Sequence, residues 1–204
     1  MLEENKVNHY LDFFDLAPEE LMSLFSLAKE KVLKEGDVYV KEGSTTGKLA
    51  YIKSGLIRCF LLKENGEETT VLLRWEDQFF TAYDSVLFNQ ASRFTYQAME
   101  PTVLLEADYQ VFMDFLNKNS KFSKAKDYFL ISMLAEMMER VESFVLLNPE
   151  ERYQRLLKDK PNIVQRCPDK YIATLLGITP VSLSRIRKRL TNSPVVVSQK
   201  MKIS

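Results

Sequence analysis

The sequence predicts a mixed α+β protein in which an antiparallel β-roll is followed by helices and a helix-turn-helix. Three observations carry this prediction. Short runs of β-branched and aromatic residues alternate with turn signals from Val32 to about Leu105. Apolar residues then recur at helical spacing over about 121–147, and a helix-turn-helix pattern occupies 169–190.

The composition is typical of a globular protein with one large domain or two small ones. The chain has 204 residues, of which 46% are hydrophobic and 27% are charged. No apolar run approaches the length of a membrane span, and the N-terminus lacks the pattern of a secretory signal. We therefore expect a cytoplasmic protein that does not bind membranes. Because Cys59 and Cys167 are too few for a disulfide framework, we expect reduced thiols.

Turn and cap residues delimit the elements of the first half. Pro18, followed by two acidic residues, predicts a short helix from about Pro18 to Ala28. Asn65-Gly66 is a strong hairpin signal between strands expected at Ile57–Lys63 and Thr69–Arg74. Strands at this regular spacing predict an antiparallel barrel or roll of about eight strands.

A short helix is expected near Gln110–Asn117, followed by the long helix at about 121–147. The long helix has two apolar stripes, and the first has the four-three spacing of a coiled-coil seam. This first stripe, the expected homodimer interface, comprises Leu130, Leu134, Met137, Val141 and Phe144. The second, expected to pack on the roll, comprises Ile131, Ala135, Met138 and Val145. A helix wholly buried within a monomer is the alternative.

The helix-turn-helix is predicted from its turn and its caps. Gly177 supplies the positive φ of a sharp helix exit, and Thr179 with Pro180 favours the start of a second helix. The outward face of that helix is basic and rich in hydroxyl groups, which suits a DNA major groove. The expected DNA-contacting residues are Thr179, Val181, Ser182, Ser184, Arg185, Lys188 and Arg189. An ordinary amphipathic helical hairpin is the alternative.

Charge is distributed unevenly although the net charge is zero. From Arg152 to the end there are 12 Lys and Arg against two acidic residues, a balance of +10, and the remainder carries −10. This split predicts an acidic body with a basic module that binds phosphates. Because Asn148-Pro149 breaks the helical pattern, we expect one domain at 1–147 and a second at 148–204 that ends in a short or incomplete wing.

The order of these elements resembles the Crp/Fnr family of bacterial transcription regulators over essentially the whole chain. Val32–Asp37, Tyr51–Gly55 and Gly66-Glu67 match the family's early β-roll pattern, and Leu176–Lys188 is similar to a variant common in Bacteroidetes-type members. The resemblance implies a cyclic-nucleotide-binding-type β-roll, a long dimerisation helix and a C-terminal winged helix-turn-helix. It also implies a homodimer that binds a near-palindromic operator, with Arg185 in the place of the family's base-reading arginine and RNA polymerase as a further candidate partner.

Family members that bind cyclic nucleotides have Gly-Glu, a short helix and then Arg followed by Ser or Thr. Here Thr81-Ala82 takes the Gly-Glu position, and Phe94 follows Arg93, the candidate phosphate ligand. We therefore expect no response to cyclic AMP. The residues of the possible effector pocket are Thr81, Ala82, Tyr83, Arg93 and Phe94. The aromatic rings in this region either fill the roll or line a site for an apolar effector; they belong to Tyr83, Phe88, Phe94 and Tyr96.

The residue counts argue against resident cofactors and against an enzyme. An iron–sulfur sensor needs about four cysteine ligands, whereas this chain has two cysteines and one histidine, His9. A metalloenzyme on a cupin-like barrel needs histidine ligands inside the roll, and none occurs between residues 32 and 105. We expect neither metal nor cofactor. The alternative function is a small-molecule sensor, for cyclic nucleotides or another ligand, that acts mainly through protein contacts.

Overall fold

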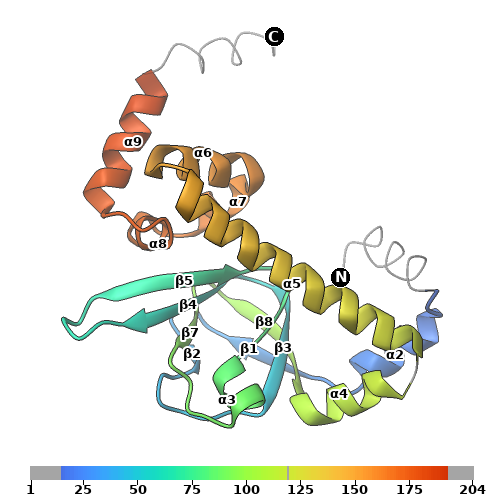
Figure 1. Cartoon of the computed structure of the whole chain (residues 1–204). Coiled ribbons are helices and arrows are strands. Elements are labelled where there is room, and N and C mark those ends of the chain that lie inside the picture. The colour runs from blue at the N-terminus through green and yellow to red at the C-terminus, as the bar shows by residue number, and fades with distance from the viewer. Residues whose placement is uncertain (1–14, 119, 193–204) are drawn as a thin grey trace.

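A computed structural model describes residues 15–118 and 120–192 (Figure 1). A β-roll is crossed by the long helix α5 (Ser120–Leu146), whose far end carries a group of shorter helices. The predicted α+β fold, with an antiparallel roll before a helix-turn-helix, is therefore confirmed. The expected wing, at about 194–204, lies outside the described residues.

The roll consists of two four-stranded sheets in which every strand pair is antiparallel. One sheet has, in spatial order, β1 (Lys29–Leu33), β8 (Thr102–Asp108), β3 (Lys48–Ser54) and β6 (Phe79–Thr81). The other has β2 (Val38–Val40), β7 (Thr95–Ala98), β4 (Ile57–Leu62) and β5 (Glu68–Arg74). Alternate residues of both sheets point inward and form one apolar core, which includes Ala50, Ile52, Ile57, Phe80 and Leu104.

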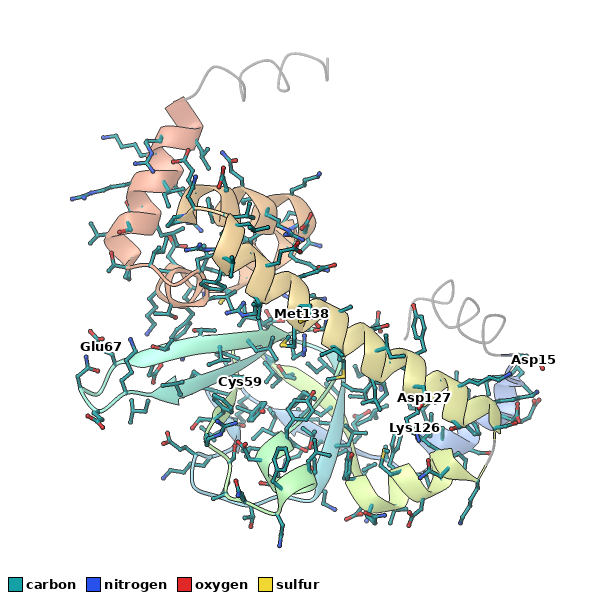
Figure 2. The ribbon with its side chains drawn as sticks, viewed as in Figure 1. Asp15, Cys59, Glu67, Lys126, Asp127 and Met138 are labelled. Atoms are coloured by element: carbon teal, nitrogen blue, oxygen red, sulfur yellow. The ribbon has the colours of Figure 1, made fainter. Side chains whose placement is uncertain are left out.

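The β4–β5 hairpin follows the turn chemistry of its sequence. Ile57 pairs with Arg74 and Leu62 with Glu68, and the loop closes with Gly66 at φ +81°. Figure 2 shows Glu67 at the tip of this hairpin, which extends away from the rest of the roll. The hairpin predicted from Asn65-Gly66 is confirmed.

The helices around the roll begin where their caps predict. The first described helix, α2 (Pro18–Phe25), ends three residues before the expected Ala28, and β1 starts soon afterwards. A short helix, α3 (Tyr83–Phe88), follows β6, and α4 (Tyr109–Asn117) follows β8. The Asp108 carboxylate caps α4 by accepting hydrogen bonds from two backbone N–H groups of its first turn.

Helix α5 has one face on the roll and one exposed apolar face, and the residues on these faces match the expected ones only in part. The packed side carries Phe122, whose ring lies 5.2 Å from that of Phe115 in α4, and Glu136, which accepts hydrogen bonds of 2.7 and 3.0 Å from Arg74 of the roll. Met137 is half-buried, whereas the expected roll-facing stripe is exposed, with Ile131 at 66%, Met138 at 60% and Val145 at 75%. The assignment of this second stripe to the roll is therefore wrong, and so is the alternative of a wholly buried helix.

The exposed seam of α5 has heptad spacing in a register slightly different from the predicted one. It comprises Ile131, Leu134, Met138, Val141 and Val145, with Leu130 beside it. Residues three and four apart lie on the same helix face, so this row and the predicted row have the same period and differ only by rotation about the axis. Phe144, predicted in the seam, instead has its ring beside Gly177 of the same chain.

The remaining helices are α6 (Pro149–Asp159), α7 (Pro161–Arg166), α8 (Asp169–Leu175) and α9 (Pro180–Asn192). Asn148 caps α6 reciprocally: its side chain accepts from the Glu151 N–H, and the Glu151 carboxylate accepts from the Asn148 N–H at 2.8 Å. The helix break predicted at Asn148-Pro149 is confirmed. A single apolar cluster joins these helices to Leu56 and Leu73 of the roll, so the expected division at residues 147 and 148 stays a prediction.

No helix in the described ranges combines the length and the apolar composition needed to cross a membrane.

We predict that Gly55→Ala lowers the free energy of unfolding by about 2 kcal/mol or more. Gly55 has φ +109°, and an added Cβ would lie 2.7 Å from the Thr102 Cα. Gly66→Ala is the matched control, because φ is also positive there but nothing lies within 4 Å, and it should cost about 1 kcal/mol. Urea denaturation of both variants measures the difference, and equal losses would contradict the prediction.

Candidate nucleic-acid interface and effector region

The helix-turn-helix is formed by α8 and α9, which cross at a closely packed point. Ala173 of α8 and Leu183 of α9 are fully buried, and Gly177 has φ +72° in the turn. The Thr179 hydroxyl oxygen accepts a hydrogen bond of 3.2 Å from the Ser182 N–H, which caps the first turn of α9. An added Cβ at Gly177 would come 2.9 Å from a ring carbon of Phe144, so the ring would have to shift, and the positive φ itself favours glycine.

The outward face of α9 brings together most of the predicted DNA-contacting residues. Val181, Ser184, Arg185 and Lys188 are exposed, and the Ser182 hydroxyl shares a hydrogen bond of 3.0 Å with Thr179. Within the part of the chain that the structure describes, neither Arg185 nor Lys188 forms an ion pair. This face therefore offers two available cations beside hydroxyl groups.

Two other arginines of α9 are paired within the protein. Arg189, predicted to contact DNA, donates to the Glu150 carboxylate at 2.6 and 3.0 Å. Arg187 donates to Asp169 at 2.7 Å and to the Tyr153 hydroxyl at 2.8 Å. These bonds fix α9 against α6 and α8, and they make Arg189 a weaker candidate for DNA contact than Arg185.

The predicted effector residues lie around α3 but do not line an open cavity. Thr81 and Ala82 are buried, and the Thr81 hydroxyl donates to the Lys48 carbonyl at 2.7 Å. The Phe80 and Tyr96 rings stack with centroids 5.6 Å apart, and the Tyr96 hydroxyl donates to the Thr81 carbonyl at 3.0 Å. Burial raises the pKa of Tyr96, so this hydroxyl stays neutral. Aromatic side chains of the roll thus occupy part of its interior.

Two of the three other predicted pocket residues, Tyr83 and Phe94, contact neighbouring side chains. The Tyr83 hydroxyl lies 3.9 Å from the Met133 sulfur of α5. Phe94 is half-buried against the core of the roll.

Arg93, the candidate phosphate ligand, is already paired with a carboxylate. Its Nε and Nη2 atoms lie 3.1 and 3.0 Å from Oδ1 of Asp84, and its backbone N–H donates to the other carboxylate oxygen at 3.1 Å. The hydrogen bond from Arg93 holds the pKa of Asp84 below its ordinary value. In the sequence Asp84 is the only acid nearby, two residues beyond the expected glutamate position, but its pairing with Arg93 was not predicted.

These residues do not fit a cyclic nucleotide. The position of the ribose-binding carboxylate holds buried Thr81 and Ala82, and the phosphate-binding arginine is neutralised by Asp84. The rings of Phe80 and Tyr96 stack inside the roll. The contacts by which the family holds a cyclic nucleotide are therefore missing from the described residues.

Both cysteines are free and buried. Burial raises the pKa of the Cys59 thiol to about 12 and that of Cys167 to about 11. Cys59 lies inside the roll (Figure 2), whereas Cys167 belongs to the core of the C-terminal helices. Among the described residues no group of three or more His, Cys, Asp or Glu side chains is arranged to hold a metal ion.

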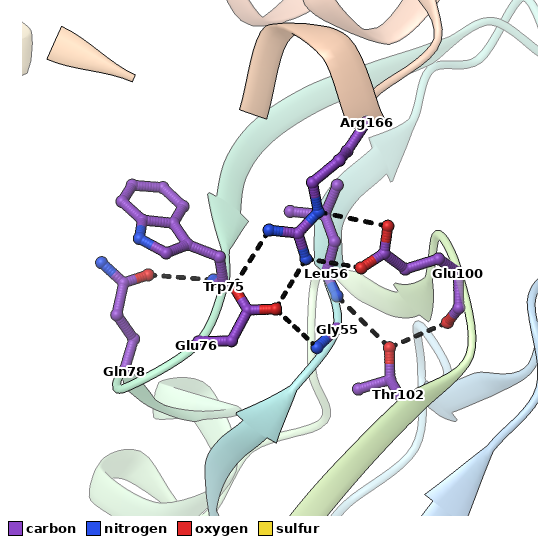
Figure 3. A network of polar contacts seen from close by, with 8 residues as sticks. All are labelled: Gly55, Leu56, Trp75, Glu76, Gln78, Glu100, Thr102 and Arg166. Carbon is purple, nitrogen blue, oxygen red and sulfur yellow. Dashed lines mark hydrogen bonds and ion pairs between the residues drawn. The ribbon is translucent and has the colours of Figure 1, made fainter. Parts of the chain in front are cut away.

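Sequence analysis missed the arginines that join the helix-turn-helix to the rest of the chain. Arg166 at the end of α7 binds two carboxylates of the roll, Glu76 and Glu100 (Figure 3). Arg140 of α5 donates to the Leu175 carbonyl at 3.1 Å, near the end of α8. Each contact joins residues far apart in the sequence, so no local pattern could predict it.

Comparison with known proteins supports the same fold and family. The family described as cyclic nucleotide-binding domain matches residues 30–119. The fumarate and nitrate reduction regulatory protein of Vibrio cholerae serotype O1 is 23% identical over 198 residues, which cover 90% of this chain and 77% of that protein. The anaerobic regulatory protein of Pasteurella multocida is also 23% identical, over 91% of this chain and 72% of its own length.

Solved structures share the architecture at low sequence identity. FixK2 from Bradyrhizobium japonicum has a TM-score of 0.68 and 13% identity, and the match covers 80% of this chain and 84% of that one. A transcriptional regulator of the CRP/FNR family from Thermus thermophilus has a TM-score of 0.63 and 18% identity, with 80% and 86% covered. These likenesses show the fold.

We predict that Asp84 titrates below the usual carboxyl pKa of about 3.9 and that Arg93→Ala raises its pKa. Because the folded pKa is depressed, the pair stabilises the fold above the unfolded pKa, and this stability is lost as pH falls through the folded pKa. Carbon-13 NMR of the carboxyl group measures the shift, and Arg155→Ala serves as a charge-matched control. An Asp84 pKa that is the same in both variants would refute the pairing.

Proposed function

Because this chain belongs to the Crp/Fnr family of transcription regulators, we propose that it binds DNA in a sequence-specific manner as a homodimer. The observation that carries the proposal is the outward face of α9, where Arg185 and Lys188 are exposed and available while neighbouring arginines are paired. An arginine on a recognition helix can donate two hydrogen bonds to guanine O6 and N7.

The residues around Arg185 suit a major groove. Val181 is 60% exposed and can contact a thymine methyl group, while Ser184 can donate to a base or a phosphate. Thr179 and Ser182 lie at the N-terminal end of α9, where backbone N–H groups favour a phosphate. Arg189 can bind a phosphate only if its hydrogen bonds to the Glu150 carboxylate break.

The exposed seam of α5 supports the homodimer. Large apolar side chains on a helix seldom remain exposed to water unless they contact a partner. An isologous contact along α5 makes the pair two-fold symmetric, so each recognition helix faces one half of a near-palindromic operator. The half-sites should then lie about one helical turn, ~34 Å, apart.

The regulator is also proposed not to respond to cyclic AMP. A nucleotide would have to displace Asp84 from Arg93 and the stacked rings of Phe80 and Tyr96 from the roll. It would also lack the charge-assisted contact to its ribose, a bond worth about 1.5–3 kcal/mol.

We predict that the protein binds a selected palindromic DNA with steep salt dependence and that Arg185→Ala weakens specific binding by about 1–3 kcal/mol. Fluorescence anisotropy measures both effects, and added cyclic AMP should leave the curve unchanged. Arg155→Ala, which removes one charge from α6, should retain discrimination between cognate and scrambled DNA. Absent or salt-insensitive binding to every selected sequence would disprove DNA recognition.

We predict that Met138→Glu converts the dimer to a monomer, because it buries a charge in the proposed seam. Sedimentation velocity at micromolar concentration measures the oligomeric state. Val111→Glu is the matched control, since Val111 is exposed on α4, outside the seam. A Met138→Glu protein that remains dimeric would place the interface elsewhere.

A further inference from the structure

The helix-turn-helix is attached to the β-roll at a fully buried arginine. Arg58 of β4 has 0% exposure, and its guanidinium carbon lies 3.6 Å from the ring centroid of Tyr171 in α8. The Phe60 ring lies on it at 4.1 Å, so the cation contacts two aromatic rings. Its Nε donates to the Thr70 hydroxyl at 2.9 Å and its Nη1 to Glu68 at 2.6 Å.

Beside Arg58, a polar contact between Thr70 and Thr174 holds α8 against the β4–β5 hairpin. The Thr174 hydroxyl oxygen accepts from the Thr70 N–H at 3.2 Å and lies 2.9 Å from the Thr70 hydroxyl. Thr70 thus binds Arg58 and α8 together. We call these contacts, which join Arg58 and Thr70 to Tyr171 and Thr174, the aromatic anchor.

A second attachment lies at Arg166 (Figure 3). Its Nη1 and Nη2 donate to the two carboxylate oxygens of Glu76 at 3.0 and 2.8 Å, and its Nε donates to Glu100 at 3.2 Å. Glu76 also accepts from the Gly55 N–H at 2.8 Å, so its carboxylate is fixed by the roll as well. We call this cluster of Arg166, Glu76 and Glu100 the carboxylate anchor.

The two anchors constrain orientation in a way that one could not. A single contact would let the helix-turn-helix rotate about that point, whereas two contacts at different places on the roll oppose rotation. The aromatic anchor uses α8 and the carboxylate anchor uses α7, and Leu56 and Leu73 of the roll belong to the same apolar cluster as Ile172. Since α5 also packs on the roll, α9 has a defined orientation relative to the α5 seam.

We propose that these two anchors are positioning contacts for DNA recognition, which set the half-site separation that the dimer accepts. The inference rests on the proposed function. In a two-fold dimer formed through α5, the distance between the two α9 helices is fixed only while each helix-turn-helix keeps its orientation on its own roll. Loss of an anchor frees rotation about the connection at 147–148, and the dimer then accepts several separations.

The test compares operators that contain the same half-site with spacers varied one base pair at a time. Wild type should prefer one spacer, and Tyr171→Ala or the Glu76→Gln/Glu100→Gln pair should reduce that preference by about tenfold, because a mobile module has a lower effective concentration at its second half-site. Affinity for a single half-site should stay unchanged. A merely structural role would lower both affinities together.

Matched controls separate the anchors from general damage. Tyr171→Phe keeps the ring over Arg58 and should keep the spacer preference. Glu64→Gln removes one carboxylate at the hairpin turn, away from both anchors, and should have no effect. The two anchors differ in chemistry and can be tested separately. If the variant of one anchor does not fold, the variant of the other anchor still tests the proposal.

The outcomes distinguish this inference from the proposed function. Wild type that binds no DNA overturns both. If the wild-type protein prefers one spacing and the folded anchor variants show the same spacer profile, the positioning role alone is overturned. A broadened profile in the anchor variants and an unchanged profile in Tyr171→Phe and Glu64→Gln support it.

Discussion

The buried cation of Arg58 determines how the two halves of the chain fit together. A buried charge is tolerated only where hydrogen bonds and aromatic faces replace water, and for Arg58 one of those faces belongs to α8. If Tyr171 moved away, the guanidinium would lose one of its two ring contacts. The first helix of the helix-turn-helix is therefore fixed against the β4–β5 hairpin, and the second helix carries the exposed cations.

Much of the fold could be predicted because its signals are local. Asn65-Gly66 specifies a hairpin turn, Pro149 starts a helix, and Gly177 with Thr179 ends one helix and begins the next. Each signal acts within a few residues, so the sequence is enough to interpret it. The outward face of α9 was predictable for the same reason, since its buried residues recur at helical spacing.

What could not be predicted depends on contacts between distant segments. The apolar period in the sequence of α5 shows that the helix has an apolar seam. Which side of the helix faces the β-roll depends on contacts with distant residues, which involve Met133 and Glu136 and leave Met138 exposed. Likewise, the sequence does not show whether a basic residue of α9 forms an ion pair within the folded protein. Arg189 meets Glu150, 39 positions earlier, and Arg185 does not have such a partner among the described residues.

The filled roll and the anchored helix-turn-helix are consistent with each other. A regulator that responds to a ligand needs room for the ligand and a DNA-binding module that can change its orientation. Here Arg93 is paired with Asp84, and aromatic side chains lie inside the roll. Two anchors hold the helix-turn-helix on the roll. Under the proposed function, in which cyclic AMP has no effect, the anchors supply the constraint on orientation that a bound ligand would otherwise provide.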